Sequence, residues 1–197
     1  MEERPILFNS EMIKAILDGR KTMTRRVVKI QPESIGAVKF TEYPTGTFNF
    51  TSNSGKVGIF NPQSIKCPYG IPGDQLWVRE TWAKIEFGYT PEIIYKADTP
   101  NLSMVSDFKG WKPSIHMFRR HSRIQLEITD IRVERVQDID EIDAQAEGTF
   151  VDTLHELKNS MTPNKDQFSI LWDSINKKRG FGWGVNPFVW VVEFERI

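Results

Sequence analysis

The sequence has little of several features that mark common protein classes. It contains a single cysteine, Cys67, among 197 residues. One thiol cannot form an internal disulfide, and it excludes every zinc site that needs several cysteines. No apolar run approaches the roughly 20 residues of a membrane-spanning helix. Residues 1–8 carry charges where an export signal would have an apolar stretch. We therefore expect a soluble cytoplasmic protein with no membrane partner.

The chain also lacks a net charge, because 26 acidic residues balance 26 basic ones. Taken alone, this balance argues against a general nucleic-acid-binding protein, which usually carries a basic excess. The charges are nevertheless segregated along the chain. Lys and Arg cluster over 20–29 and 109–123, whereas residues 138–156 hold acids but neither Lys nor Arg. Segregated charge makes local fields that the balanced total hides.

Several catalytic motifs are absent as well. Ser10 and Ser122 have no Gly-x-Ser-x-Gly context, and no glycine-rich nucleotide loop occurs. We therefore do not expect a serine hydrolase, a kinase or a dehydrogenase. His116 and His121 have no third ligand at a recognisable spacing, so we expect no metal site and no cofactor.

Three short helices are predicted from apolar residues at helical spacing. The first begins at the N-cap Ser10 and ends at Gly19, and the second covers 140–147 and stops at Gly148. The third covers 167–175, where Phe168, Leu171, Trp172 and Ile175 form a stripe. A stripe of this kind is more often core than site.

Strands are predicted where residues alternate or are rich in β-branched and aromatic types. The longest, 123–136, changes phase near Asp130, which indicates a bulge or bend. The others cover 76–82, 93–97 and an apolar, central strand at 188–194. Short helices among mostly antiparallel strands, without βαβ alternation, indicate a single α+β domain over residues 1–197, built as a sheet or barrel.

Residues 33–72 differ in composition from the rest of the chain. They are rich in Gly, Ser, Thr, Asn and Pro, with scattered aromatic residues. This composition predicts hairpins or an elaborated loop, inserted into the domain and lying outside its core.

The segment 19–26 is the densest candidate site. It combines four cations and two hydroxyl groups without one acid. Such a loop can bind phosphate through charged side chains, hydroxyls and backbone amides, although a solvated basic turn is the plain alternative. It also allows catalysis, since a lysine with a lowered pKa can activate a nearby hydroxyl as a nucleophile. Lys21 and Thr24 are the natural pair, and they meet only if the chain turns between them.

Residues 16–24 (ILDGRKTMT) resemble the signature of ASCH-domain proteins. Later segments are similar to that family in the same order: the Gly-Asp turn at 73–74 before a core strand, the Ala- and Glu-containing segment 143–148, and the closing strand 190–194. The resemblance runs from end to end with gaps, and it is greatest to the longer ASCH-like proteins of phages and prophages. It implies a PUA-like β-barrel, mixed but mostly antiparallel, with short peripheral helices, and it implies RNA binding.

Some ASCH-like proteins are small bacterial amidohydrolases that remove the acetyl group from acetylcytidine. In these enzymes a lysine accepts a proton, a threonine is the nucleophile and a glutamate donates a proton. The matching positions here are Lys21, Thr24 and Glu147. The resemblance thus implies amide hydrolysis on a modified cytidine, with Arg25 or Arg26 orienting the ligand. A phage-encoded ribonuclease and a non-catalytic accessory protein that binds RNA or protein are the alternatives.

A second group of candidate binding residues mixes aromatic and basic side chains, as surfaces for single-stranded nucleic acid do. It lies mainly in 109–123, and its alternative is a surface loop with a packed tryptophan. Tryptophans in strands are also more often core than base-stacking platforms. We expect a groove for RNA or a nucleoside between 19–26 and 111–123, with ligand-binding residues Arg20, Thr22, Arg25, Arg26, Trp77, Arg79, Trp111, Lys112, His116, Arg119 and Arg120.

Overall fold

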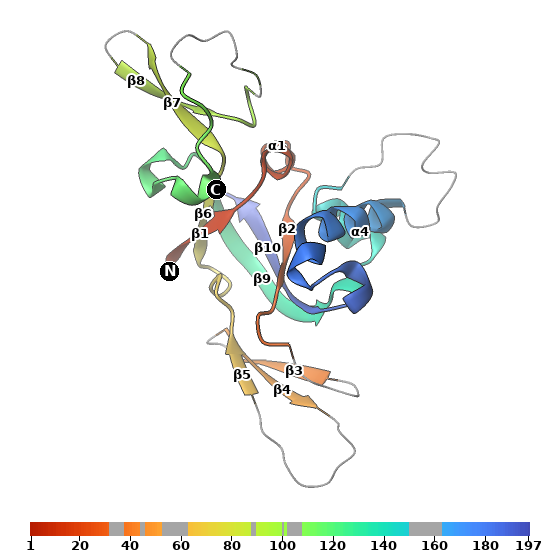
Figure 1. Cartoon of the computed structure of the whole chain (residues 1–197). Helices are drawn as coiled ribbons and strands as arrows, with labels where there is room; N and C mark the ends of the chain where they lie inside the picture. The colour runs from red at the N-terminus through yellow and green to blue at the C-terminus, as the bar shows by residue number, and fades with distance from the viewer. Residues whose placement is uncertain are drawn as a thin grey trace.

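A five-stranded mixed sheet forms the centre of the protein (Figure 1). The computed structural model describes residues 1–31, 38–43, 46–52, 63–87, 90–99, 101, 108–149 and 163–197. The strand order is β1-β6-β9-β10-β2. The strands are, in that order, Glu3–Leu7, Gln75–Arg79, Gln125–Arg135, Phe188–Arg196 and Met23–Val27. β1 and β6 are parallel, and the other neighbours are antiparallel.

Strand β10 is buried on both faces, as its continuous apolar sequence predicts for a central strand. Trp190 and Val192 belong to one hydrophobic core, which also includes the apolar face of helix α1 (Ser10–Leu17). Val189 and Val191 point the other way, into a second core with helices α2 (Glu141–Ala146) and α4 (Pro163–Asn176). The sheet therefore separates two cores, and the candidate site lies at its β2 edge.

The bend predicted near Asp130 is confirmed as a bulge in β9. Glu193 of β10 pairs with Asp130, whereas the next residue, Phe194, pairs with Ile128. Thr129 is thus the extra residue, and it shifts the side-chain alternation of β9 between the two halves of the strand.

The predicted helices are present, with shifted ends. α1 is capped by Asn9, not by Ser10, because the Asn9 side chain accepts a hydrogen bond from the Met12 N–H at 2.8 Å. α2 begins after the N-cap Asp140 and is followed by Gly148, whose φ is +86°. A Cβ added at Gly148 would lie 2.9 Å from Cβ of Ala15, so glycine lets the end of α2 approach α1. The described residues also form five single-turn 3₁₀ helices: η1 Ser114–His116, η2 Arg119–His121, η3 Val136–Asp138, η4 Lys177–Arg179 and η5 Trp183–Val185.

Two small antiparallel sheets lie at opposite ends of the central sheet (Figure 1). One is the hairpin β7–β8 (Trp82–Phe87 and Thr90–Tyr95). The other has the order β3-β4-β5 (Val38–Tyr43, Thr47–Ser52 and Gln63–Lys66) and supplies the hairpins expected within 33–72. The predicted strand 76–82 is divided between β6 and β7 at Glu80, a buried carboxylate that Arg123 Nε contacts at 2.8 Å.

The expectation that 33–72 lies outside the core is wrong for several of its residues. Phe48, Ile65 and Cys67 are buried in the α1-side core. The Phe48 ring meets the Trp190 ring edge-on, with centroids 5.1 Å apart. The isolated apolar residues of this polar segment were the signal for burial. Only every second side chain of a strand faces the core, so a strand that packs on the core can be polar at the other positions.

The predicted closed barrel is not found in the described part of the chain. β1 and β2 are the two edges of an open sheet, and they do not pair with each other. The outer edge of β2 instead faces the end of α2, where Thr22 N–H donates to Ala146 O at 2.9 Å. The architecture is therefore open α+β. No helix among the described residues is long and apolar enough to cross a bilayer.

The buried Cys67 thiol gives a pH-dependent prediction. Burial raises its pKa to about 11, and hydrogen bonds from the backbone of Tyr69 and Gly70 offset this only in part. Between pH 9 and 11 the unfolded thiol therefore loses its proton while the folded one keeps it, so the free energy of unfolding falls as pH rises. The loss attributable to Cys67 is about 2–3 kcal/mol. Urea unfolding at pH 8.5 and pH 11 measures how far the free energy of unfolding falls for the wild type and for Cys67→Ala. The wild type should lose more stability than the variant, and an equal loss in both would contradict the prediction.

Candidate functional site

A buried ion pair joins Lys21 to Glu147 at the start of the candidate site. The Lys21 ammonium donates to Glu147 Oε2 at 2.7 Å, to Glu147 O at 2.8 Å and to Met23 O at 2.7 Å. Three acceptors match its three donors. The side chains are 0 % and 3 % exposed, and the backbones of Lys21 and Glu147 form a β-bridge that holds them together. Burial lowers the pKa of Lys21, and the negative charge of Glu147 opposes this shift.

Arg25 is also buried and is held by three carboxylates. Its Nη2 lies 2.6 Å from Glu134 Oε1 and 2.5 Å from Asp143 Oδ2. Its Nη1 lies 3.6 Å from Glu147 Oε1, which is an ion-pair distance but too long for a hydrogen bond. The charge of Arg25 is therefore committed to α2 and β9, and its fixed guanidinium becomes part of the site wall.

The segment 19–26 is not the exposed basic loop that its composition suggests. β2 begins at Met23, and Lys21, Thr24 and Arg25 are buried. Thr22 and Arg20 remain exposed, and Arg20 pairs with Asp18 at 2.9 Å. The phosphate-binding loop expected here is therefore replaced by a buried charge network beside an edge strand.

A cavity of about 340 Å³ is lined by residues of β2 and of α4. Its apolar wall comes largely from α4, and its polar wall comes from β2 and the end of α2. The lining residues are Met12, Thr24, Arg25, Arg26, Val27, Lys29, Tyr69, Glu147, Phe168, Leu171, Trp172, Ile175, Asn176, Arg179 and Phe181.

Two polar groups at this cavity have no hydrogen-bond partner among the described residues. Glu147 Oε1 is buried and accepts no hydrogen bond from the described residues. The hydroxyl of Thr24 makes no hydrogen bond to any part of the chain that the structure describes, although the residue is only 2 % exposed. A buried acceptor without a donor costs about 1–3 kcal/mol. Both groups are therefore available to a bound molecule.

The outer edge of β2 carries further backbone hydrogen-bonding groups. Val28 N–H donates to Phe188 O, and Phe194 N–H donates to Thr22 O, so the even-numbered residues of β2 face β10. Because bonded positions alternate in an antiparallel pair, the backbone groups of Arg25 and Val27 point to the outer edge. Among the described strands, β2 pairs only with β10, so none pairs with its outer edge.

The three proposed catalytic residues meet in pairs and not as one group. Lys21 meets Glu147 directly, and Thr24 shares the cavity with Glu147. Within the described residues, Lys21 makes no hydrogen bond with the Thr24 hydroxyl. Lys21 lies just before β2, where its backbone bridges to Glu147, and its ammonium donates to Met23 O and not to Thr24.

The apolar wall was missed by the sequence analysis, although its pattern was visible. The stripe Phe168, Leu171, Trp172 and Ile175 was assigned to core, and all four residues line the cavity. Phe168 and Trp172 serve both purposes, because they also belong to the core beneath α4. Tyr69, Arg179 and Phe181 gave no local signal, because only the fold brings them to β2.

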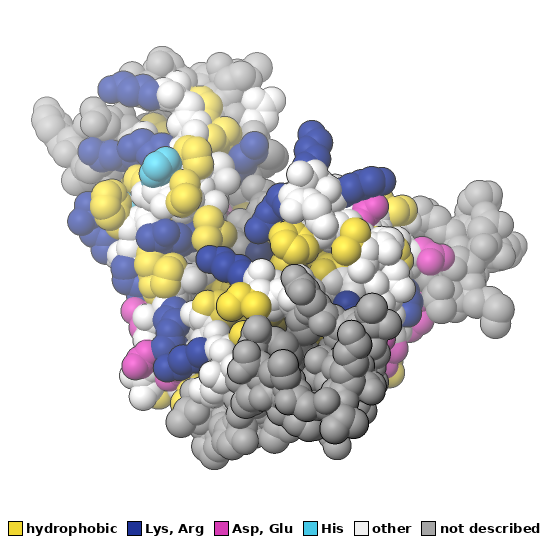
Figure 2. Space-filling model, turned by 60° about the horizontal axis from the view of Figure 1, so that its bottom comes forward, with side chains coloured by type: hydrophobic (Ala, Val, Ile, Leu, Met, Phe, Trp, Pro, Cys, Tyr) yellow, Lys and Arg dark blue, Asp and Glu magenta, His cyan; other side chains and the backbone are white. Residues whose placement is uncertain are grey.

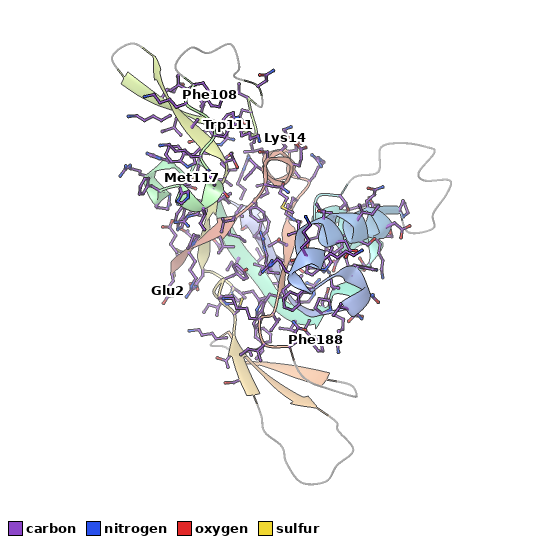
Figure 3. All side chains as sticks on the ribbon, viewed as in Figure 1. Glu2, Lys14, Phe108, Trp111, Met117 and Phe188 are labelled. Carbon is purple, nitrogen blue, oxygen red and sulfur yellow. The ribbon has the colours of Figure 1, made fainter. Side chains whose placement is uncertain are left out.

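The second predicted binding group lies at the other edge of the sheet. Arg119 contacts Glu3 of β1 at 2.5 Å, and Trp111 packs against Phe108 near β7 (Figure 3). Trp77 is buried on β6, with the Arg79 guanidinium 4.6 Å from its ring centroid. None of these residues lines the cavity, and neither do Lys112, His116 and Arg120. The strand order separates the two groups, so the structure does not form the groove expected between 19–26 and 111–123.

No protein-family model matches the sequence, and no curated protein matches it. One solved structure with some similarity is a high-resolution crystal structure of an ASCH domain from Lactobacillus crispatus JV V101. It has a TM-score of 0.40 and 11 % sequence identity, over 99 % of this chain and 79 % of that chain. In the described residues, no group of three or more His, Cys, Asp or Glu side chains is placed to hold a metal ion.

Proposed function

We propose that the chain is an ASCH-like domain that binds RNA or a nucleoside, with one base held in the cavity along β2. The apolar wall supports this, because Trp172, Phe168 and Phe181 offer the aromatic surfaces on which unstacked bases pack. The cavity volume of about 340 Å³ falls at the lower end of the range for small-molecule sites, roughly 300–1,000 Å³. A single nucleoside suits that size.

The observation that carries the proposal is Glu147 Oε1, which accepts no hydrogen bond from the described residues. A buried carboxylate oxygen at a cavity wall is satisfied by a ligand N–H group, and the exocyclic amine of cytosine or adenine provides one. The outward backbone groups of Arg25 and Val27 can add contacts to the edge of the base. An aromatic wall facing a hydrogen-bonding edge is the usual arrangement for recognising a base in single-stranded RNA.

Blocking the cavity tests the proposal. Leu171 lines the cavity from α4, so Leu171→Trp is expected to fill it and to weaken binding of cytidine and of short single-stranded RNA by at least about 30-fold. Ile170 is the matched control, because it is the adjacent α4 residue, is 64 % exposed and does not line the cavity. Calorimetric titration of the wild type, Leu171→Trp and Ile170→Trp gives the comparison. Equal affinity for all three proteins would refute the location, and no binding to the wild type would refute the function.

A second candidate function is hydrolysis of the acetyl amide of acetylcytidine in the same cavity. Two observations favour it: the Lys21–Glu147 contact of 2.7 Å and the free hydroxyl of Thr24 at the cavity. Transfer of one proton along that contact turns the pair into a neutral amine and a carboxylic acid. These are the base and the acid that amide cleavage needs. Burial lowers the pKa of Lys21 and so favours the neutral amine.

In this scheme the Thr24 oxygen attacks the acetyl carbon, and Lys21 takes the hydroxyl proton. Glu147 protonates the amine of cytosine as the carbon–nitrogen bond breaks, which leaves an acetyl ester on Thr24. Water then attacks the ester carbon, the carbon–oxygen bond to Thr24 breaks, and acetic acid leaves as the hydroxyl is regenerated. The scheme requires Lys21 Nζ to approach the Thr24 hydroxyl during the reaction. Its basic test is chromatography of acetylcytidine incubated with the protein, where the expected product is cytidine.

The remaining alternatives are outcomes of the same experiments. Cleavage of single-stranded RNA, with acetylcytidine left intact, would favour the ribonuclease. Binding of RNA without any product would favour a non-catalytic module.

A further inference from the structure

Three cations at the cavity have no acidic partner within the part of the chain that the structure describes. Arg26, Lys29 and Arg179 all line it, and no acidic side chain of the described residues lies within ion-pair distance of any of them. They come from the C-terminal half of β2, the residues just after it, and η4. Their convergence on one cavity is therefore a product of the fold and not of one basic stretch of sequence.

The other charges at the cavity are already compensated. Among the described residues that line the cavity, Glu147 is the only acidic one, and Lys21 and Arg25 share its charge. Arg25 has two further carboxylates. The cavity thus carries three cations that form no ion pair with a described acid; Arg26 is half-buried, whereas Lys29 and Arg179 are exposed to solvent.

The guanidinium groups have donors to spare. Arg26 Nη2 donates to Leu7 O at 2.7 Å, while its Nε is buried and bonds to no described group. Arg179 Nη1 donates to Asn176 Oδ1 at 3.2 Å. Burial lowers the pKa of Arg26, and the positive charge of Arg179 lowers it further, against the opposing effects of Tyr69 and Glu147. Arginine nevertheless stays charged at neutral pH, so both groups are donors to an anion.

The lining of the cavity combines two kinds of side chain. Aromatic residues of α4 and Glu147 suit a base, and Arg26, Lys29 and Arg179 suit an anion. Lys and Arg side chains also lie among hydrophobic ones across the middle of the face seen from the β3-β4-β5 side, with acidic side chains mostly toward its edges (Figure 2). A ligand that carries both an aromatic base and a negative group matches both kinds of side chain.

We propose that the cavity takes a nucleotide and not a free nucleoside, with Arg26, Lys29 and Arg179 holding its phosphate. This inference rests on the proposed base-binding function of the same cavity. Arginine is well suited to the role, because its planar group forms paired hydrogen bonds to phosphate oxygens. The phosphate belongs either to a mononucleotide or to an RNA strand, and the two sources share this chemistry.

The test is a set of calorimetric titrations with cytidine, cytidine 5′-monophosphate, cytidine 3′-monophosphate and a short cytidine oligonucleotide. At least one phosphorylated ligand is expected to bind about 10- to 100-fold tighter than cytidine, corresponding to one or two charge-assisted contacts. Its advantage should shrink as salt rises. Tightest binding by a mononucleotide identifies a free nucleotide as the ligand, and tightest binding by the oligonucleotide identifies an RNA strand.

Arg179→Gln and Lys178→Gln provide the matched variants. Both residues are exposed, but Arg179 lines the cavity and the adjacent Lys178 does not. Arg179→Gln should lower the affinity for the phosphorylated ligand about 10-fold and leave that for cytidine unchanged, and Lys178→Gln should change neither. Equal binding of cytidine and all phosphorylated ligands would overturn the inference and leave the base-binding function standing. Absence of binding by every ligand would overturn both.

Discussion

Replacement of Glu147 by alanine is expected to lower the free energy of unfolding by about 3–5 kcal/mol, the range measured when one partner of a buried ion pair is removed. Lys21 has no exposed surface on its side chain, so its ammonium cannot turn to water when the carboxylate is lost. It would keep two carbonyl acceptors, from Met23 and residue 147, but no compensating charge. Urea unfolding at neutral pH measures the loss.

Two variants separate this effect from ordinary surface losses. Glu11→Ala removes an exposed ion pair with Lys14 and is expected to cost less than about 1 kcal/mol. Adding Lys21→Met to Glu147→Ala should recover part of the lost stability, because the uncompensated charge disappears with the lysine. A loss below 1 kcal/mol for Glu147→Ala alone would show that the pair is not buried in solution.

Thr24→Val is expected to lower the turnover of acetylcytidine by about 10³-fold or more, since it removes the nucleophile of the hydrolysis scheme while keeping the shape of the side chain. The Thr24 hydroxyl makes no hydrogen bond to the described residues, so its loss should not disturb β2. Binding of cytidine should therefore remain within a few-fold of the wild type, and the substitution separates chemistry from binding. Chromatographic assay of cytidine release, beside calorimetry, gives both quantities.

Thr22→Val is the matched control for this experiment. Thr22 is exposed just before β2 and does not line the cavity, so its replacement should leave turnover unchanged. Undiminished turnover by Thr24→Val would remove Thr24 from the mechanism. A wild-type protein that releases no cytidine at high enzyme concentration would contradict the hydrolase function altogether.

The sequence could predict those features of the fold that depend on neighbouring residues. The spacing of Ile13 and Ile16 predicts α1, and the phase change at Asp130 predicts the bulge in β9. The cap was placed one residue late because Asn9 and Ser10 are both good caps, and only the backbone conformation distinguishes them. The pattern of neighbouring residues therefore places these elements to within a few residues.

The site depends on contacts between residues far apart in the chain, and these were less predictable. Glu147 was selected by resemblance, but its direct contact with Lys21 spans 126 residues and follows from the bridge between the start of β2 and the end of α2. The acids that neutralise Arg25 come from β9 and α2. Sequence composition showed the cations of 19–26 and had no means of showing that most of them are paired.

Strand order decided the remaining differences. Segment 111–123 precedes β9 and contacts β1 and β6, whereas the basic segment 19–26 leads into β2 at the opposite edge. Two basic segments thus suggested one groove, and the fold separates them by the width of the sheet. The apolar stripe of α4 differs in another way. Spacing alone assigns its residues to the core, but they also form a wall of the cavity.

The most direct test of the central claim is a titration of the protein with cytidine, followed by the NMR shifts of its side-chain methyl groups. We predict that the methyl signals of Val27, Leu171 and Ile175, which line the cavity, shift together along one binding curve. Those of Ile115, which is 60 % exposed near the opposite edge of the sheet, should stay in place. Shifts confined to Ile115, or no shifts at millimolar cytidine, would contradict the claim that the cavity along β2 is a nucleoside site.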